Sequence, residues 1–334
     1  MTAAPVLRTG RDADAADFIA LIGACWAEYP GCVMDVDGEV PELRALESHY
    51  AAHGGALWAA EQDGRVVGMI GTKPLDDGAW EICKMYAYAA QRGTGLAQAL
   101  IAAAEGHARA HGATAMRLWS DTRFDRAHRF YEKASYVRSG PIRALNDLSH
   151  SMEFEYGKPL IGSVVRQLDA AAAVSAVPRL AAILRECVEA GGNLSFLAPL
   201  RADKAAAYCR RVASQAARGE RILFAAWSDG VLAGSVALDL ALPENQRHRA
   251  EIKKLMVAPA ARRCGLATHL LRAAEAASRE AGRQVLTLAT QQGGEAERLY
   301  RAEGWTAMGT IPDYSRAADG TPETTAFFWK QLPP

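Results

Sequence analysis

Net charge of either sign, paired cysteines and long apolar runs are all missing from this sequence of 334 residues. Lysine plus arginine and aspartate plus glutamate both total 38, so the net charge is zero, which argues against broad binding of nucleic acids or membranes through charge. None of the six cysteines forms a C-x-x-C pair or lies near a histidine cluster, so we expect free thiols and no metal site. The sequence also lacks a secretory leader pattern and any run long enough to cross a bilayer, so we expect a cytoplasmic location.

What the sequence does contain is a segment that occurs twice. Residues 81–97, EICKMYAYAAQRGTGLA, match residues 251–267, EIKKLMVAPAARRCGLA, at a constant offset of 170 (251 − 81 and 262 − 92). In both copies a glutamate lies eleven residues before an arginine, and an apolar run ends in Arg-x-x-Gly-x-Ala. Because the rest of each half repeats the same order of elements, we predict two duplicated domains, at 1–157 and 162–334, joined near Gly157-Lys158-Pro159.

The repeated segment predicts a strand, a tight turn and a helix. Small residues in the turn let the backbone approach a ligand closely. The first turn of a helix has N–H groups without partners, and these favour an anion such as a phosphate. We therefore interpret each copy as a pyrophosphate-binding loop. The alternatives are a plain strand-to-helix turn and a dinucleotide-binding Rossmann unit, and the second needs a third glycine where Gln98 and Thr268 stand.

These motifs resemble those of the GNAT superfamily of N-acetyltransferases. Both turns fit its loop Gln/Arg-x-x-Gly-x-Gly/Ala, and Tyr131 and Tyr300 are similar to the tyrosine of its Tyr-x-x-x-Gly-aromatic run, with Ser135 replacing the glycine in the first copy. The second half also resembles a tabtoxin-resistance-like branch, through LPENQRHRAEIKKL and GTIPDYSRAADGTPET. The resemblance implies an α/β (α+β) fold of two tandem domains. Each would be a mixed, mostly antiparallel sheet flanked by helices, with a splayed strand pair at the loop.

The same resemblance implies acetyl-CoA as the cofactor and direct transfer of an acetyl group to a primary amine of a small molecule or peptide. The loops would hold the pyrophosphate and the preceding strands would pair with the pantetheine arm, although those strand side chains could equally be core. The cofactor-binding residues that it implies are Met85, Tyr86, Ala87, Arg92, Gly93, Thr94, Gly95, Leu96 and Ala97, and then Leu255, Met256, Val257, Arg262, Arg263, Cys264, Gly265, Leu266 and Ala267.

Four further residues are candidates for catalysis. An amine with a pKa of ~10 is mostly protonated at neutral pH, so populating its free base costs roughly 4 kcal/mol. Glu81 and Glu251 match the position of the general base in the family's histone-acetylating branch, which would accept this proton; the alternative is a strand-end ion pair. Tyr131 and Tyr300 would support the departing thiolate; the alternative for each is an aromatic core residue.

Other features leave the function open at several points. The alternative to two catalytic domains is one catalytic half and one non-catalytic half that binds acyl-CoA or acts as a scaffold, and we expect a monomer that forms an internal pseudo-dimer, or a homodimer. Acidic residues in one loop hint at a cationic acceptor in the first half: Asp35, Asp37, Glu39 and Glu42. Further residues could line a binding site or belong to solvated loops. They are Asp121, Thr122, Arg123, Asn245, Gln246, His248 and Arg249. Cys83 and Cys264 are expected to be small fillers.

Overall fold

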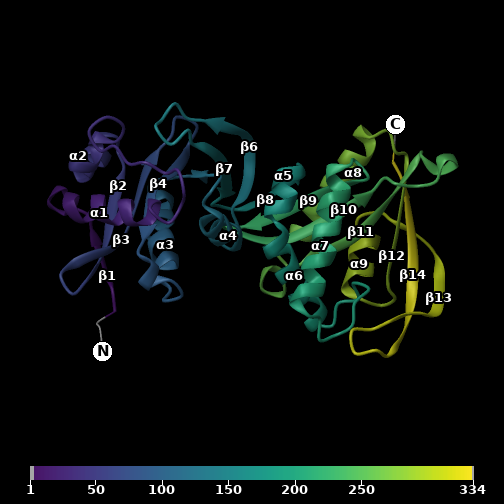
Figure 1. Cartoon of the computed structure of the whole chain (residues 1–334). Coiled ribbons are helices and arrows are strands. Elements are labelled where there is room, and N and C mark those ends of the chain that lie inside the picture. Colours follow the sequence, from purple (N-terminus) through teal and green to yellow (C-terminus); the bar gives the residue numbers. More distant parts are fainter. Residues whose placement is uncertain (1–3, 333–334) are drawn as a thin grey trace. The chain divides into compact units, whose positions relative to one another are not determined.

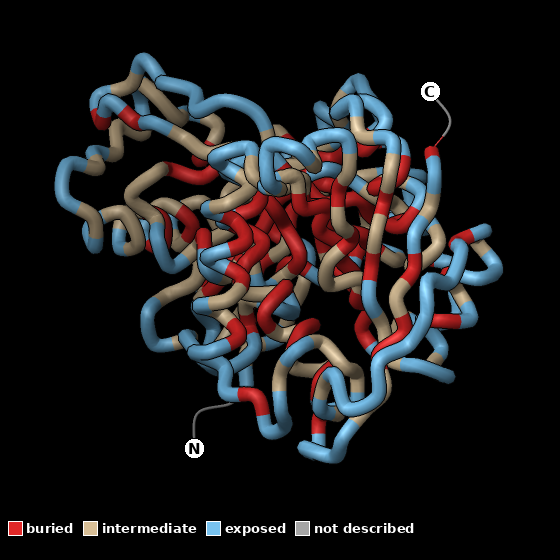
Figure 2. Tube along the Cα trace, turned by 90° about the vertical axis from the view of Figure 1, so that its right-hand side faces the viewer, coloured by how far each residue is buried: buried red, intermediate tan, exposed pale blue. Residues whose placement is uncertain are grey.

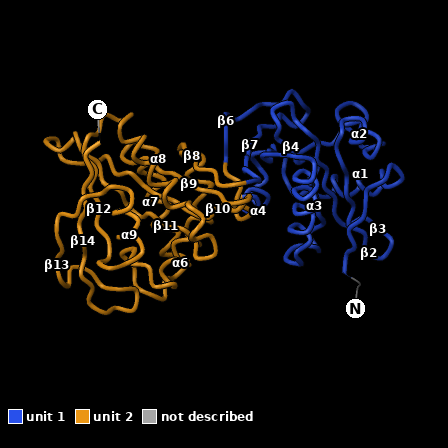
Figure 3. Tube along the Cα trace, turned by 180° about the vertical axis from the view of Figure 1, so that it is seen from behind, with its two compact units in different colours: residues 1–131, 138–161 blue, residues 132–137, 162–334 orange. Residues whose placement is uncertain are grey.

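The computed structural model describes residues 4–332, and these form two compact units. Unit 1 comprises residues 1–131 and 138–161, and unit 2 comprises residues 132–137 and 162–334 (Figure 3). Each unit carries one seven-stranded mixed sheet flanked by helices, which confirms the predicted fold class. The predicted linker at Gly157-Lys158-Pro159 is wrong, because these residues continue a strand that pairs with residues 115–117.

The first half begins with a strand and ends with two (Figure 1). Its elements are β1 (Val6–Thr9), α1 (Ala15–Trp26), α2 (Leu46–Ala52), β2 (Ala56–Gln62), β3 (Arg65–Pro74), β4 (Ala79–Ala87), α3 (Leu96–Ala110), β5 (Ala115–Asp121), α4 (Asp125–Lys133), β6 (Val137–Ala144) and β7 (Met152–Pro159). The strand order is β1-β2-β3-β4-β5-β7-β6, and β4–β5 is a parallel pair. The tight hairpin between β2 and β3 is turned by Asp63-Gly64, both with positive φ.

The second half repeats this topology. Its elements are β8 (Ser163–Leu168), α5 (Ala170–Ser175), α6 (Val177–Glu189), α7 (Ala202–Ala217), β9 (Arg221–Ser228), β10 (Val231–Asp239), β11 (Arg249–Val257), α8 (Leu266–Glu280), β12 (Val285–Gln291), α9 (Glu295–Ala302), β13 (Thr306–Arg316) and β14 (Pro322–Gln331). The strand order β8-β9-β10-β11-β12-β14-β13 matches that of the first sheet, strand for strand. The parallel pair is again the central one, β11–β12. Strand β13 is mostly exposed, and the sequence analysis did not predict it.

Each sheet is covered on both faces, so the core of each unit has two layers. In unit 2, helices α5, α6 and α7 pack with Trp227 and Met256 on one face, while α8 packs with Ile252 and Val257 on the other. In the first sheet, α1 and α2 cover one face, whereas α3 packs against β2 and β3. Figure 2 shows the buried residues gathered in the interior, with exposed residues on the outer turns of the trace.

An ion pair occurs at the same place in each sheet, buried in the first and partly buried in the second, and it ties the strand next to the sheet edge to the helix that follows the loop. Lys158 on β7 donates to Glu105 on α3 at 2.6 Å, and both side chains are less than a tenth exposed. Lys330 on β14 donates to Glu275 on α8 at 2.8 Å, with Trp305 Nε1 as a second donor to that carboxylate. Glu275 lies 170 positions after Glu105 (275 − 105), so the duplication extends into the core.

Candidate functional site

The first Arg-x-x-Gly-x-Ala loop forms the junction between β4 and α3. A short 3-10 turn at Ala89–Gln91 leads into Arg92, and α3 begins at Leu96. Gly95 precedes the helix with φ of 90°, and Gly93 has φ of 78°, both in the left-handed region where a side chain would be strained. No atom lies within 4 Å of where a Cβ at either glycine would be, so this face of the loop is open.

The second loop has the same backbone with different side chains. A 3-10 turn at Pro259–Ala261 leads into Arg262, and Gly265, with φ of 84°, precedes α8. Arg263 occupies the position of Gly93 and keeps its positive φ, at 64°. A non-glycine residue in this conformation costs about 1–2 kcal/mol, so the loop shape is retained in unit 2 at some expense to stability.

The amides at the start of both helices are available to a ligand. Among the described residues, the N–H groups of Ala97 and Gln98 in unit 1, and of Ala267 and Thr268 in unit 2, have no recorded acceptor. These first-turn donors, with the helix dipole behind them, suit a phosphate-bearing group. The donor set therefore fits a pyrophosphate, and its binding there remains a prediction.

The strands before the loops splay away from their parallel partners. Strand β4 pairs with β5 only from Ala79 to Ile82, and β11 pairs with β12 only from Arg249 to Glu251. The predicted pantetheine-pairing residues, 85–87 and 255–257, lie beyond these points, on strand as predicted. Their pairing with a cofactor remains a prediction.

Each of the two candidate bases lies beside a lysine. The carboxylate Oε2 of Glu81 is 3.4 Å from Lys73 Nζ, and that of Glu251 is 3.3 Å from Lys253 Nζ. In unit 2 the lysine also contacts Asp239 at 3.3 Å, and Asp239 is bound in turn by Arg221 at 3.1 Å. Both glutamates keep some solvent access, with side chains 18% and 32% exposed, which a proton acceptor needs.

Burial sets the chemistry of the two candidate tyrosines. Tyr131 and Tyr300 are buried, and desolvation raises the pKa of both phenols well above the usual range. Net proton transfer from such a phenol to a thiolate of pKa ~8.5 is uphill, so the structure favours a hydrogen-bond donor over a full acid. The hydroxyl of Tyr131 lies 3.8 Å from Met85 Sδ, at the splay, whereas Tyr300 packs against Trp305 and Phe328.

The remaining sequence candidates are bonded within the protein. Asp121 pairs with Arg123, and the Thr122 amide donates to Met152 O, which fixes the end of β5 against β7. Arg249 donates to Gln246 Oε1 and to Thr287 Oγ1. These contacts give both groups a structural explanation, and a site role for them remains a prediction.

The acidic loop of unit 1 is also internally paired. Asp37 binds Arg44, Glu39 accepts from the Leu148 amide, and Glu42 lies 3.1 Å from Lys84 Nζ. Asp35 accepts from two amides of its own loop. A cationic acceptor would therefore have to displace existing partners.

All six cysteines are free. Cys83 is partly buried, and desolvation raises the pKa of its thiol to about 12, in keeping with the predicted filler role. Cys264 is exposed in the second loop, where its Sγ lies 2.8 Å from Ala261 O, so the prediction that it is a small filler is wrong. No helix within residues 4–332 is long and apolar enough to span a membrane.

A bulge in each central strand is the main feature that the sequence analysis missed. Lys84 in β4 and Lys254 in β11, again 170 positions apart (254 − 84), have positive φ of 49° and 54°. Ile252 and Val257 consequently pack on the same face although they are five positions apart, which a regular strand does not allow. A lysine is not a usual left-handed residue, so only its recurrence at the same position in both copies could have signalled the bulge.

The sequence analysis also missed a glutamate of unit 1 that forms an ion pair with the loop arginine. Arg92 Nη2 lies 2.5 and 2.6 Å from the two carboxylate oxygens of Glu28, which follows α1, and Arg126 of α4 donates to the same carboxylate at 2.6 Å. In unit 2, Arg262 instead donates to Val257 O at 3.4 Å. The charge offered by the two loops therefore differs, although their backbones agree.

Several solved structures resemble parts of this chain. The candidate acetyltransferase yncA of Salmonella typhimurium, solved with its cofactor acetyl-CoA, is 19% identical, with a TM-score of 0.43, and the match covers 52% of this chain and 95% of that one. The ribosomal-protein-alanine N-acetyltransferase of Brucella melitensis is 23% identical, with a TM-score of 0.42, over 51% of this chain and 99% of that one.

Sequence comparison gives a relative and a family. An uncharacterized N-acetyltransferase from the hisH–hisA intergenic region of Azospirillum brasilense is 38% identical over 105 residues, which are 31% of this chain and 61% of that protein. The model of the acetyltransferase (GNAT) family matches twice, at residues 21–136 and 193–305, and so covers more than half of the chain. The chain therefore belongs to the acetyltransferase (GNAT) family, and the family domain occurs in it twice.

Proposed function

We propose that this protein is an acetyl-CoA-dependent N-acetyltransferase that transfers an acetyl group to a primary amine of a small molecule or peptide by direct attack. One observation carries the proposal: in both units, a loop with unpaired first-turn amides follows a splayed strand that carries a partly exposed glutamate. Acetyl-CoA, when bound, supplies the activated acetyl thioester.

The chain's own residues have distinct roles in this proposal. The first-turn amides and the loop arginine bind the pyrophosphate, which fixes the cofactor along β4 or β11. Glu81 or Glu251 accepts the proton of the attacking amine, directly or through water, and Lys73 or Lys253 lies beside that carboxylate. Tyr131 or Tyr300 remains protonated because of its burial and donates a hydrogen bond to the sulfur as it leaves.

The test measures the release of free CoA thiol from acetyl-CoA. The release should depend on the added acceptor, which is varied across a panel of amines, polyamines, aminoglycosides and peptides. At least one amine should stimulate release, and the E81Q and E251Q variants should each remove the contribution of one unit, by about 100-fold for that unit. D203N, which alters an exposed carboxylate on α7, serves as the control and should leave the rates unchanged. Failure of every amine to stimulate release would overturn the proposal.

A second candidate is that only unit 2 catalyses transfer, while unit 1 binds acyl-CoA or acts as a scaffold. The Glu28 carboxylate favours it, because a phosphate must compete with this carboxylate for Arg92. The same two variants separate the cases. Complete loss of activity in E251Q with full activity in E81Q would support the single-site form.

A further inference from the structure

A small pocket in unit 2 lies on the sheet face that carries Glu251. It is formed by α6, α7 and strands β9 to β11, and its free volume is about 20 Å³, enough for one water-sized group. Its lining is mostly apolar. Its lining includes Tyr208 of α7, and Lys254 and Met256 of β11.

The bulge in β11 determines which side chains face this pocket. Ile252 and Val257 pack beneath α8, so Glu251 and Met256, their neighbours along the strand, face α6 and α7. Lys254 lies between them, and its Nζ donates to Ser195 Oγ, in the segment between α6 and α7, at 2.7 Å. The bulge therefore places the candidate base and this lysine on one face of one strand.

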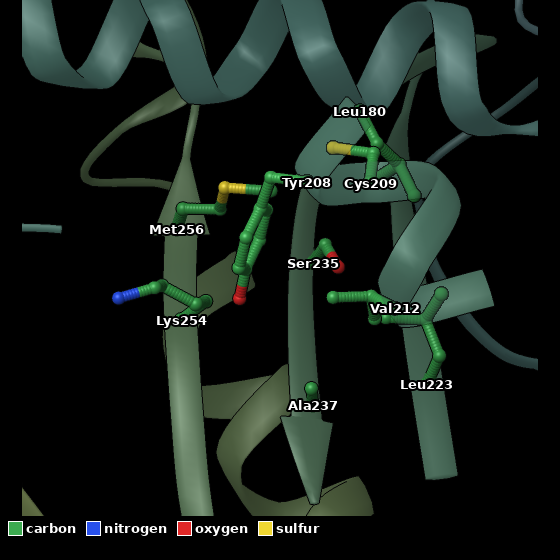
Figure 4. Close-up of a pocket in the computed structure, with 9 residues that line it drawn as sticks. All are labelled: Leu180, Tyr208, Cys209, Val212, Leu223, Ser235, Ala237, Lys254 and Met256. Atoms are coloured by element: carbon green, nitrogen blue, oxygen red, sulfur yellow. The ribbon is translucent and has the colours of Figure 1, made fainter. Parts of the chain in front are cut away.

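The ammonium of Lys254 is held by neutral groups. Within the part of the chain that the structure describes, it has no recorded ion pair. Its Nζ lies 5.9 Å from the ring centroids of both Phe196 and Tyr208. Figure 4 shows Tyr208 reaching between β11 and β10, with the Lys254 amine at the outer edge of the pocket. Burial and the nearby charges of Lys253 and Arg221 lower the pKa of Lys254 to about 8.

The equivalent lysine of unit 1 is neutralised within the protein. Lys84 lies 3.1 Å from Glu42, a residue of the acidic loop between α1 and α2. In unit 2 the corresponding segment is GGNLSFLAPL, which has no carboxylate and supplies Ser195 and Phe196 instead. The two units thus share the bulge lysine, but only unit 1 provides an anion for it.

We propose that the pocket beside Lys254 recognises the acceptor of unit 2, and that this acceptor is an amine that also carries a carboxylate, as an α-amino acid or a short peptide does. This inference rests on the proposed function of the same site. The carboxylate binds Lys254 and Ser195 at the edge of the pocket, where charge remains solvated. A methyl or methylene group of the acceptor enters the small apolar space, since burying the charge there would be unfavourable.

The first test measures acetyl transfer to matched acids and amides as acceptors: leucine with leucinamide, and glycine with glycinamide. In an E81Q background, which isolates unit 2, the free acids should be preferred. K254M should raise the KM for the acids by about 10- to 100-fold while the KM for the amides changes less than about twofold. K254R should restore the preference because it retains the charge, and K84M, the matched change in unit 1, should leave the acid-to-amide ratio unaltered.

A second test needs no turnover. Trace labelling of lysines with acetic anhydride, followed by peptide mass spectrometry, reports the accessibility of Lys254 directly, with Lys84 as the internal control. N-acetyl-leucine should slow labelling of Lys254 at least about threefold, whereas N-acetyl-leucinamide should not, and Lys84 should be unaffected by either.

The outcomes separate the two proposals. Transfer with equal KM values for acids and amides would overturn the inference and leave the acetyltransferase proposal intact. Protection of Lys254 by N-acetyl-leucine without transfer to any amine would support the carboxylate site and overturn the proposed function. Equal protection by the acid and the amide, or none by either, would overturn the inference whatever the activity.

Discussion

The two units agree in backbone and differ in the charges placed around it. Both have the left-handed glycine before the central helix, the lysine bulge and the splayed strand pair. Around these shared features, unit 1 pairs its loop arginine with Glu28 and its bulge lysine with Glu42, whereas unit 2 leaves both cations to neutral partners. The comparison teaches that duplication has preserved the backbone of the proposed cofactor and acceptor sites, while the charges around both have diverged.

The largest expected effect concerns a feature that the units share. E105Q and E275Q should each destabilise their own unit by about 3 kcal/mol, because each leaves a lysine ammonium in a mostly buried site without its counter-ion. Urea unfolding followed separately for each unit measures this change. The exposed pair Arg201–Asp203 provides the control, and D203N should change the free energy of unfolding by less than about 0.5 kcal/mol. A difference between the units larger than about 2 kcal/mol would mean that the two cores are not equivalent.

The next prediction addresses the loops. G95D and G265D should each weaken CoA binding at one unit by about 100-fold and leave the other unit unchanged, since the new carboxylate repels the phosphates at the helix start. Calorimetric titration with CoA measures the change. G112D and G282D impose the same left-handed strain at the other ends of α3 and α8, and both should retain binding. Loss of both sites from either loop variant would show that the units do not bind independently.

A smaller effect should reveal the difference between the loops. In a G265D background, which leaves only the unit 1 site, E28Q should tighten CoA binding by about fivefold, because Arg92 is released from a carboxylate that competes with phosphate. The same titration reports it. Unchanged or weaker binding in E28Q would remove the proposed electrostatic difference between the cofactor loops.

The smallest expected effect is a pH dependence confined to unit 2. The folded-state pKa of Lys254 is lowered to about 8, against ~10.4 in an unfolded chain, so the unfolded state binds more protons between these values. The free energy of unfolding should therefore rise with pH from about 8 to 10.4, by about 1 kcal/mol after allowance for partial exposure. Below pH 8 Lys254 is charged in both states, so the full cost of holding that charge in the folded protein lowers the free energy of unfolding. The groups around this ammonium are Lys253, Arg221, Glu251, Ser195, Phe196 and Tyr208.

The difference between wild type and K254M isolates this effect, since other titrating groups are common to both proteins. K84M should show no such rise in this pH range. If wild type and K254M have parallel stability profiles between pH 7 and pH 10, Lys254 is not held in an unfavourable charged state.

The sequence was sufficient to predict the duplicated topology, because it depends on local signals that occur twice in the same order. The apolar run, the arginine-glycine turn and the helix-forming run of each copy formed the predicted strand-to-helix junction, and the two halves share one order of elements. Strand β13 was missed because most of its residues are exposed and its sequence lacks a clear apolar alternation.

The electrostatic surroundings of the site could not be predicted in the same way. Glu28 reaches Arg92 across 64 positions of sequence, and Lys254 meets Ser195 across 59, so these partners depend on how distant segments are packed. The depth at which Tyr131 and Tyr300 are buried, which decides between proton donor and hydrogen-bond donor, likewise follows from tertiary packing. Local pattern placed these residues on the correct elements but could not supply their environments.

The most direct test of the central claim is a calorimetric titration of the wild-type chain with acetyl-CoA. Because both loops present unpaired amides at a helix start, we predict two binding sites per chain, with the weaker one in unit 1, where Glu28 holds Arg92. A stoichiometry of one would contradict the two-site account, and the absence of binding would contradict the assignment of these loops to the cofactor altogether.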